Sequence, residues 1–326
     1  MRKPEYLSPT SIKCFIENPE DFYIHYLSDN KPPKPPQSQP MSVGSGFDAF
    51  VKSYLHEKIH GKNHKDADLF ELKTLFEAQV EEHNRDFAWD HGAAAFAAYK
   101  GSGALADLML MLESAINEPR FEIEIQGIIN GINFLGKPDI YYINKEGQTI
   151  ILDWKVNGWC SKWNVSPMKG YMKLLSPEGE VLKEQHKEVT RTMYRGVEIN
   201  SRFYLEQLNK DWAAQTAIYG WLCGENVGNE FVTCIDQIAC GPSGEKYPKI
   251  RIAEHRLRVS RDFQLGIMKV AKEIDERIQT EHFFTEMSES DSKARMLALD
   301  EKSAVIAHLY TSDDPNDKLF LEMMNG

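Results

Sequence analysis

Residues 121–156 alternate between apolar and polar side chains, and this period of two constrains the fold more than any other feature of the chain. Two turns divide the segment. Asn130-Gly131 is a dipeptide that favours a two-residue hairpin turn, and Lys145-Glu146-Gly147 provides a second turn. We therefore expect an antiparallel meander in which the last two strands bring Asp139 and Asp153 close together.

The last strand of this meander ends in Asp153-Trp154-Lys155. In an extended strand, Asp153 and Lys155 point to one face and Trp154 points to the other. Carboxylate oxygens suit a hard cation such as Mg²⁺ or Mn²⁺. A lysine beside them can orient a water molecule or stabilise charge on a phosphate. The pattern favours metal-assisted hydrolysis of a phosphodiester, and the alternative is an exposed Asp/Lys pair on a surface hairpin.

Helical patterns lie on both sides of the meander. A capped helix follows Ser8-Pro9, Asn18-Pro19 interrupts it, and the proline-rich residues 31–40 form an extended connector. The periodicity predicts helices over 44–60, 66–86, 92–117, about 204–223 and 261 to about 285, and strands over 230–240 and 249–259. We therefore predict an α/β fold with a central mixed sheet flanked by helices and an N-terminal helical lobe.

Charge is unevenly distributed along the chain. The net charge is −11, which by itself argues against a partner rich in phosphate. Residues 155–202 nevertheless contain nine basic and five acidic residues, so this stretch carries a charge of +4. A locally basic segment of this kind can hold a polyanion. The alternative is an ordinary solvated insertion.

Composition also bears on the compartment. No apolar run reaches the roughly 18–20 residues that span a bilayer. The first residues, Met-Arg-Lys-Pro-Glu-Tyr, lack the apolar stretch of a signal peptide, so we expect a cytoplasmic protein. The five cysteines are scattered, which favours free thiols over a disulfide framework.

Four segments together resemble the PD-(D/E)XK nuclease superfamily, and within it the RecB-like branch that includes CRISPR adaptation nucleases and phage exonucleases. They are Leu7-Ser8-Pro9-Thr10-Ser11-Ile12 running into Phe22-Tyr23, Gly44-Ser45-Gly46-Phe47-Asp48, the pair Asp139 and Asp153-Trp154-Lys155, and Gln215-Thr-Ala-Ile-Tyr219. The resemblance implies a restriction-endonuclease-like core. It places a nuclease domain over residues 1–285, with a helical lobe at about 44–117, a catalytic core at about 121–260, a basic insertion at about 157–205, and a peripheral helical tail over 286–326.

The resemblance also implies a set of site residues. Asp48, Asp139, Asp153 and the backbone carbonyl of Trp154 would hold one or two Mg²⁺ or Mn²⁺ ions. Asp48 stands where the family usually has a histidine, and the alternative role for it is a charge in the first turn of a helix. Asp139, Asp153, Lys155, Gln215 and Tyr219 would form the catalytic set.

An iron–sulfur cluster is not expected. Relatives that hold one use four cysteines, and this chain has Asn18-Pro19 where they have Cys-Pro and lacks the companion Cys-x-x-Cys.

The expected substrate is DNA, attacked at its ends. Its contacts would come from Gln215, Tyr219, Lys162, Lys169, Lys173, Arg191 and Arg195, with Trp159, Trp163 and Tyr171 available to stack on unpaired bases. The chain has no P-loop motif, so unwinding would need a helicase partner, and a single-strand annealing or binding protein is a further expected partner. No membrane partner is expected, and ring-forming relatives make an oligomer an open alternative.

Two other functions compete with an exonuclease. One is a DNA-binding module of a recombination or adaptation complex that has kept the fold without catalysis, and the other is an endonuclease of the same superfamily. His56, His60 and His64 recur at a spacing of four residues and could contact a metal, but we expect them at solvated positions of a helix.

Overall fold

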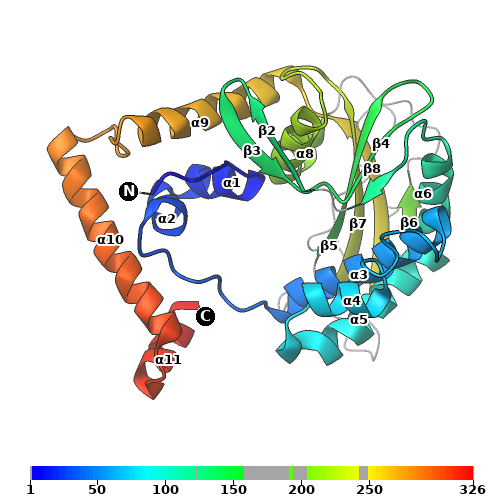
Figure 1. Ribbon diagram of the computed structural model, residues 1–326, viewed down its shortest axis with the longest axis horizontal. Coiled ribbons are helices and arrows are strands. Elements are labelled where there is room, and N and C mark those ends of the chain that lie inside the picture. Colours follow the sequence, from blue (N-terminus) through cyan, green and yellow to red (C-terminus); the bar gives the residue numbers. More distant parts are fainter. Residues whose placement is uncertain (1, 122–123, 158–190, 194–203, 242–248, 326) are drawn as a thin grey trace.

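A six-stranded mixed sheet with helices on both faces forms the centre of the protein (Figure 1). The computed structural model describes residues 2–121, 124–157, 191–193, 204–241 and 249–325. The strand order is β1-β4-β5-β7-β8-β6, where β1 is Arg120–Phe121, β4 is Ile140–Ile143, β5 is Thr149–Asn157, β6 is Arg191–Met193, β7 is Val232–Gly241 and β8 is Lys249–Arg258. The predicted α/β fold with a central mixed sheet is confirmed.

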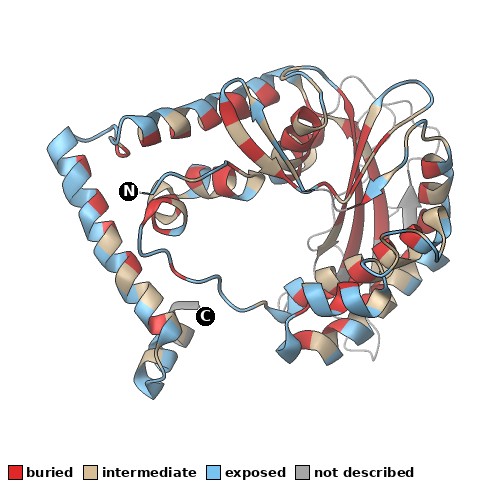
Figure 2. Ribbon diagram, in the orientation of Figure 1, coloured by how far each residue is buried: buried red, intermediate tan, exposed pale blue. Residues whose placement is uncertain are grey.

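Strand direction changes across this sheet. β4 and β5 are antiparallel, β5 and β7 are parallel, and β7 and β8 are antiparallel. β5 and β7 lie in the middle and are largely buried, as Figure 2 shows by their colour. A strand buried on both faces is a rigid support for the side chains that it carries, because its backbone is held by neighbours on both sides.

The two faces of β5 are covered by different helices. Ile150, Leu152 and Trp154 point to the face covered by α3 (Gln39–His60), α5 (Arg85–Gly101) and α6 (Ala104–Glu113). Ile151 packs with Tyr219 of α8 (Lys210–Leu222) on the opposite face. Because side chains alternate along a strand, Asp153 and Lys155 point to the same face as Ile151, toward α8.

The long helix α3 packs against the sheet through a row of residues four positions apart. Val43, Phe47, Val51 and Leu55 are fully buried, and the ring of Phe47 meets Trp154 edge to face at 6.2 Å. The helix begins at Gln39, five residues earlier than predicted, since Pro40 is tolerated in the first turn where no backbone N–H is required.

The other predicted lobe helices are shorter than expected. The helix predicted over 66–86 is α4 (Leu72–Gln79) followed by the short 3₁₀ turn η2 (Glu82–Asn84), because the Glu71 side chain caps the start and Val80 is extended. The helix predicted over 92–117 is interrupted at Gly103, whose φ of 87° belongs to the left-handed region and separates α5 from α6.

The predicted meander is only partly correct. β2 (Ile125–Ile129) and β3 (Ile132–Gly136) form the expected hairpin, with Asn130 and Gly131 at positive φ, but this hairpin is a separate two-stranded sheet. It is joined instead to the N-terminal segment by a bridge between Leu7 and Phe134. Its Gly127 and Gly136 lie against the side chain of Leu222 on α8, so the hairpin packs over that helix.

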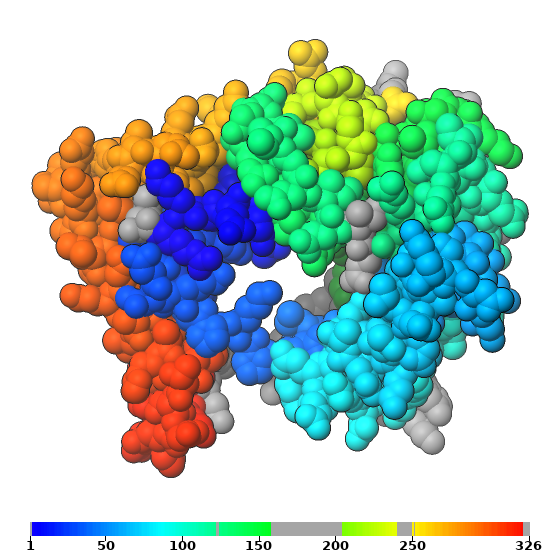
Figure 3. Space-filling view, in the orientation of Figure 1, coloured from blue at the N-terminus to red at the C-terminus, as the bar shows by residue number. Residues whose placement is uncertain are grey.

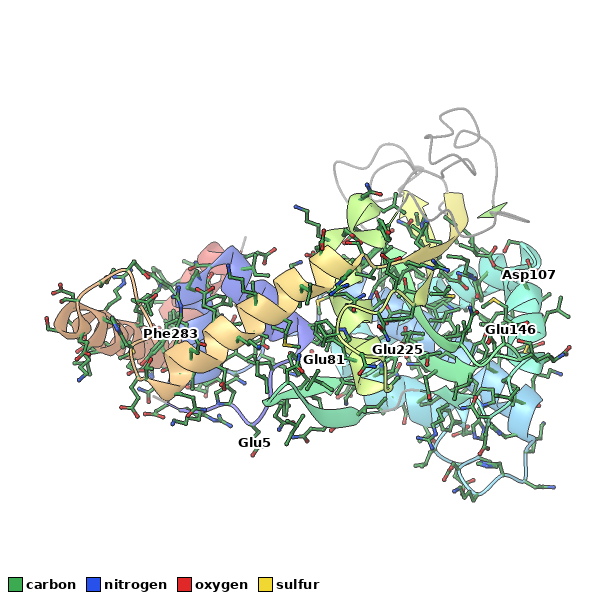
Figure 4. All side chains as sticks on the ribbon, turned by 90° about the horizontal axis from the view of Figure 1, so that it is seen from above. Glu5, Glu81, Asp107, Glu146, Glu225 and Phe283 are labelled. Atoms are coloured by element: carbon green, nitrogen blue, oxygen red, sulfur yellow. The ribbon has the colours of Figure 1, made fainter. Side chains whose placement is uncertain are left out.

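The N- and C-terminal helices pack on each other. α1 (Pro9–Glu17), α2 (Pro19–Phe22) and the π-helical turn η1 (Tyr23–Leu27) lie beside α9 (Arg261–Gln279) and α10 (Glu289–Thr311) (Figure 1). Phe283, labelled in Figure 4, lies between α9 and α10. It stacks on Phe22, and Tyr23 donates a hydrogen bond to Asp300. The segment predicted as a peripheral tail thus contributes α10 to this core, and α11 (Pro315–Asn325) follows it.

Two further elements complete the chain. The helix predicted over 204–223 is divided into α7 (Leu205–Leu208) and α8 at Asn209, whose side chain caps α8.

Figure 3 shows an opening through the molecule between the N-terminal segment, the β2–β3 hairpin and the helices of the lobe. None of the helices in the described part of the chain combines the length and the hydrophobicity that crossing a membrane requires.

Candidate active site

Asp139, just before β4, lies beside Asp153 of the neighbouring strand β5. The register pairs Ile140 with Leu152, which brings Asp139, the residue just before β4, beside Asp153 and Trp154. The backbone N–H of Trp154 donates a hydrogen bond of 2.9 Å to Oδ2 of Asp139. This bond fixes the orientation of the Asp139 carboxylate, while the indole of Trp154 lies on the opposite face and donates to the hydroxyl of Tyr99.

Helix α3 contributes Asp48 and also Lys52, a residue that the sequence analysis missed. The Lys52 side chain is only 1% exposed, and its Nζ lies 2.6 Å from Oδ2 of Asp48 and 3.2 Å from Oδ1 of Asp139. The spacing of four residues between Asp48 and Lys52 could have indicated this pair, because such residues share one face of a helix. Lys52 therefore links Asp48 of the helical lobe to Asp139 beside the sheet.

The other predicted catalytic residues form a continuous chain. Lys155 makes an ion pair with Asp153, and its Nζ donates a hydrogen bond of 2.7 Å to Oε1 of Gln215. Nε2 of Gln215 in turn donates a hydrogen bond of 2.7 Å to the hydroxyl of Tyr219. Gln215 and Tyr219 are one helical turn apart on α8, and their shared face is directed at β5.

Asp153 has the least favourable electrostatic environment of these residues. Its side chain is 4% exposed, and its Oδ2 is the atom that pairs with Lys155. Burial raises the pKa of Asp153 to about 7, Lys155 opposes the rise, and the nearby Asp139 adds to it. A buried carboxylate costs free energy, and a bound cation would reduce that cost.

These side chains line one open cavity. Its volume is about 540 Å³, and it is lined by Asp48, Asp139, Asp153, Lys155 and Gln215 together with residues of α3, α4, β5 and the segment before α3. A second cavity of about 620 Å³, which reaches Lys13 of α1 and Lys210 of α8, shares Lys155 and Gln215 with the first. The two cavities therefore meet at these two residues.

The donor set fits a hard divalent cation. Asp48, Asp139 and Asp153 offer only oxygen atoms, which is the preference of Mg²⁺ and Mn²⁺. They are not, however, among the groups of described residues whose ligand atoms all lie within 4.8 Å of one another. The ammonium of Lys52 lies between Asp48 and Asp139 and neutralises part of their charge.

The predicted backbone contact of Trp154 is observed only through its N–H, so the carbonyl ligand stays a prediction. The predicted DNA contacts Lys162, Lys169, Lys173 and Arg195 lie outside the described residues, as do Trp159, Trp163 and Tyr171. Arg191 is in β6, and its side chain is outside the description.

Comparison with known protein families gives a match over the first half of the chain. The model of the PD-(D/E)XK nuclease superfamily matches residues 6–167, just under half of the chain. The matched segment includes Asp48, Asp139, Asp153 and Lys155 and ends before Gln215 and Tyr219. The match, together with the mixed sheet flanked by helices, indicates a metal-dependent nuclease. A search of curated proteins found no match.

Proposed function

We propose that this protein is a metal-dependent deoxyribonuclease of the RecB-like branch, which removes nucleotides from DNA ends in recombination, repair or phage DNA metabolism. One observation carries the proposal. Asp139, Asp153 and Lys155 lie together on β4 and β5, and Lys155 is hydrogen-bonded to the Gln215–Tyr219 pair of α8. The superfamily match covers the first part of this arrangement independently.

Asp48, Asp139 and Asp153 would hold the Mg²⁺ or Mn²⁺ ion. When bound, such an ion lowers the pKa of a water ligand and polarises a phosphoryl oxygen. The Asp153 carboxylate favours this ion because it is buried beside a second carboxylate, Asp139. Asp139 is held in place by the Trp154 N–H at Oδ2, and its other oxygen, Oδ1, accepts a hydrogen bond from Lys52 of α3.

Lys155 would act on the reacting phosphate. Its ammonium is between Asp153 and Gln215, at the point where the two cavities meet, and it would orient the attacking water and stabilise negative charge on the phosphorus-bound oxygens. Gln215 fixes the position of Lys155, and Tyr219 fixes Gln215. Burial raises the pKa of Tyr219, so its hydroxyl keeps its proton and serves as a hydrogen-bonding group.

The shape of the surface supports a polymeric substrate. The two cavities continue past Lys155 and Gln215 and include Lys137 on one side and Lys13 and Lys210 on the other. Lys13 is paired with Asp211 and Lys137 with Glu124, so a phosphate backbone that extends in both directions would replace these carboxylates with its own oxygens. A helicase or a single-strand annealing protein would supply the strand, since the chain has no P-loop.

A digestion assay tests this proposal. Wild type, Lys155→Ala and the control Lys73→Ala would meet end-labelled linear DNA and closed circular DNA, with Mg²⁺, Mn²⁺ or EDTA. Lys73 is an exposed lysine of α4 and leaves the site intact. We expect metal-dependent loss of linear DNA, unchanged in Lys73→Ala and reduced at least about 100-fold in Lys155→Ala. Full activity of Lys155→Ala would refute the assigned role, and equal rates on circular DNA would indicate an endonuclease.

The position of Lys52 favours a second candidate, a DNA-binding module without catalysis. Its ammonium already neutralises Asp48 and Asp139, which would otherwise attract the metal. Calorimetric titration with Mn²⁺ and a DNA-binding assay separate the two functions. Retention of DNA without cleavage under any metal condition would support the binding module.

A further inference from the structure

Three histidines gather at the far end of α3, away from the candidate active site. The ring centres of His56 and His60 are 4.9 Å apart, those of His60 and His64 are 4.8 Å apart, and those of His56 and His64 are 5.2 Å apart. The expectation of solvated helix positions is wrong. His56 is 4% exposed, and the side chains of His60 and His64 are 10% and 24% exposed.

The backbone explains why sequence spacing alone did not show this cluster. α3 ends at His60, and Gly61 follows with a φ of 77°, a conformation that glycine adopts readily. The chain therefore turns back on itself, and His64 comes from the loop after the helix to lie against His60. The ring of His56 is stacked on Phe70 at 4.2 Å and forms the wall behind the pair.

Glu118 completes the cluster from a third segment, the connector before β1. Its Oε1 lies 3.2 Å from Nδ1 of His60 and 3.8 Å from Nε2 of His64. Each of the three residues offers one ligand atom, and these atoms all lie within 4.8 Å of one another. Among the residues that the structure describes, no other group of three or more histidines, cysteines or carboxylates is drawn together in this way.

The chemistry of the donors selects the ion. Two imidazole nitrogens and one carboxylate form a ligand set typical of zinc, whereas Mg²⁺ and Ca²⁺ prefer oxygen atoms alone. Tetrahedral zinc with bonds of about 2.0–2.1 Å needs ligand atoms roughly 3.3 Å apart. The distances of 3.2 and 3.8 Å from the Glu118 oxygen to the two imidazole nitrogens are already near this value, and its 66% exposed side chain can adjust. All three ligand atoms lie within 4.8 Å of one another, so the two imidazoles must also approach each other when zinc binds.

Asp66 lies next to His64 and adds a second carboxylate to the surroundings. Its Oδ2 lies 3.8 Å from Nδ1 of His64, and its backbone N–H donates a hydrogen bond of 3.3 Å to the same nitrogen. A neutral imidazole that accepts at Nδ1 carries its proton on Nε2, so zinc that binds through Nε2 must displace this proton. Lys65 and Arg120 line the same cavity of about 380 Å³, and their charges oppose the cation.

We propose that His60, His64 and Glu118 form a zinc site that fastens the loop after α3 and the connector before β1 to the end of α3. Water completes the coordination from the cavity side. The separation of twelve positions between Asp48 and His60 places this site about 18 Å from the candidate active site along the helix. The zinc site therefore differs from the nuclease site in place, in donor atoms and in the ion that it takes, and it does not depend on the proposed function.

Zinc titration of the full chain tests this site. The protein is first stripped with a chelator, and an Asp139→Asn/Asp153→Asn background removes the contribution of the nuclease site. We expect one equivalent of Zn²⁺ to bind this background, with millimolar Mg²⁺ unable to compete. The same equivalent of Co²⁺ should give the visible absorption of a tetrahedral site. Absence of any zinc equivalent in this background overturns the proposal.

Variants in this background assign the ligands. His60→Asn/His64→Asn should abolish binding, and Glu118→Gln should weaken it at least about tenfold. The control is His83→Asn, since His83 also pairs with a glutamate, Glu81, but has no third ligand, and it should bind zinc normally. Zinc should raise the melting temperature of the background protein and of the His83→Asn control. It should leave that of the double histidine variant unchanged. If the double histidine variant fails to fold, Glu118→Gln decides, and unchanged zinc affinity in it overturns the proposal.

Discussion

Gly46 lies where α3 packs against α5, close in sequence to the proposed metal ligand Asp48. A Cβ added at Gly46 would lie 2.6 Å from the backbone carbonyl oxygen of Ala88 on α5. A Cβ at Gly92 would lie 2.8 Å from the backbone of Gly46, so the two helices touch through their main chains at this point. Two residues further along α3 is Asp48. We therefore predict that Gly46→Ala both destabilises the protein and displaces a proposed metal ligand.

The magnitude follows from the geometry and from a matched control on the same helix. Contacts of 3.0–3.4 Å are already tight, so a Cβ at 2.6 Å forces the helices apart by about 0.4–0.8 Å. Overpacking of this kind costs about 1–3 kcal/mol. Gly44 is also inside α3, but a Cβ there meets only Val156, at 3.9 Å. Both substitutions gain the helix propensity of alanine, about 0.5–1 kcal/mol. Gly44→Ala should therefore stabilise the protein, and the difference between the two variants isolates the steric cost.

Urea unfolding measures this difference, and a cleavage assay measures its effect on the site. The free energy of unfolding of Gly46→Ala should fall about 1–3 kcal/mol below that of Gly44→Ala. Because small displacements of reacting groups are costly, metal-dependent cleavage by Gly46→Ala should fall roughly 10- to 100-fold. Equal stability of the two alanine variants would refute the reasoning, since it would mean that α3 and α5 separate without cost.

Three further substitutions test the electrostatics. Lys52→Met should destabilise the metal-free protein by about 2–4 kcal/mol, because it leaves two partly buried carboxylates without their ammonium, and Mn²⁺ should restore part of this loss in urea unfolding. The pKa of Asp153 is raised to about 7, so its contribution to stability declines as pH rises from about 4 to 7; Asp153→Asn should gain stability over wild type across that range in EDTA, and a constant difference would contradict this. Burial lowers the pKa of His255 to about 3, so the protein should lose stability as pH falls below 6.5, by up to about 1.4 kcal/mol per pH unit. The urea midpoint of His255→Asn should lack this part of the pH dependence.

The sequence was informative where local geometry decides the outcome. The alternation of β5 predicts that Asp153 and Lys155 share a face, and the structure places both toward α8. The spacing of four between Gln215 and Tyr219 predicts one helical face, and the two side chains are hydrogen-bonded to each other. Both relations depend only on residues within one element, so the period of that element fixes them.

Relations between distant segments were less accessible. The hairpin of β2 and β3 was predicted correctly as a pair of strands, but its separation from the main sheet depends on its contacts with Leu7 and α8. The histidine cluster depends on the positive φ of Gly61 and on Glu118, which is 58 residues from His60 in sequence. No period within one element contains such information, because loops and distant side chains determine it.

Lys52 shows how these two kinds of relation combine in the site. Its pairing with Asp48 is local and could be derived from the helix, whereas its contact with Asp139 requires α3 to lie against β4 and β5. Without the Lys52 ammonium and without a metal ion, the three carboxylates would face each other in a largely buried space. Their repulsion would push the lobe away from the sheet. The Lys52 ammonium offsets this repulsion at the interface between lobe and sheet. The protein can therefore assemble its carboxylates before a metal ion binds. An incoming ion must compete with Lys52 for Asp48 and Asp139, and with Lys155 for Oδ2 of Asp153. Metal binding therefore exchanges two lysine contacts for ligand bonds, one at the lobe and one on β5.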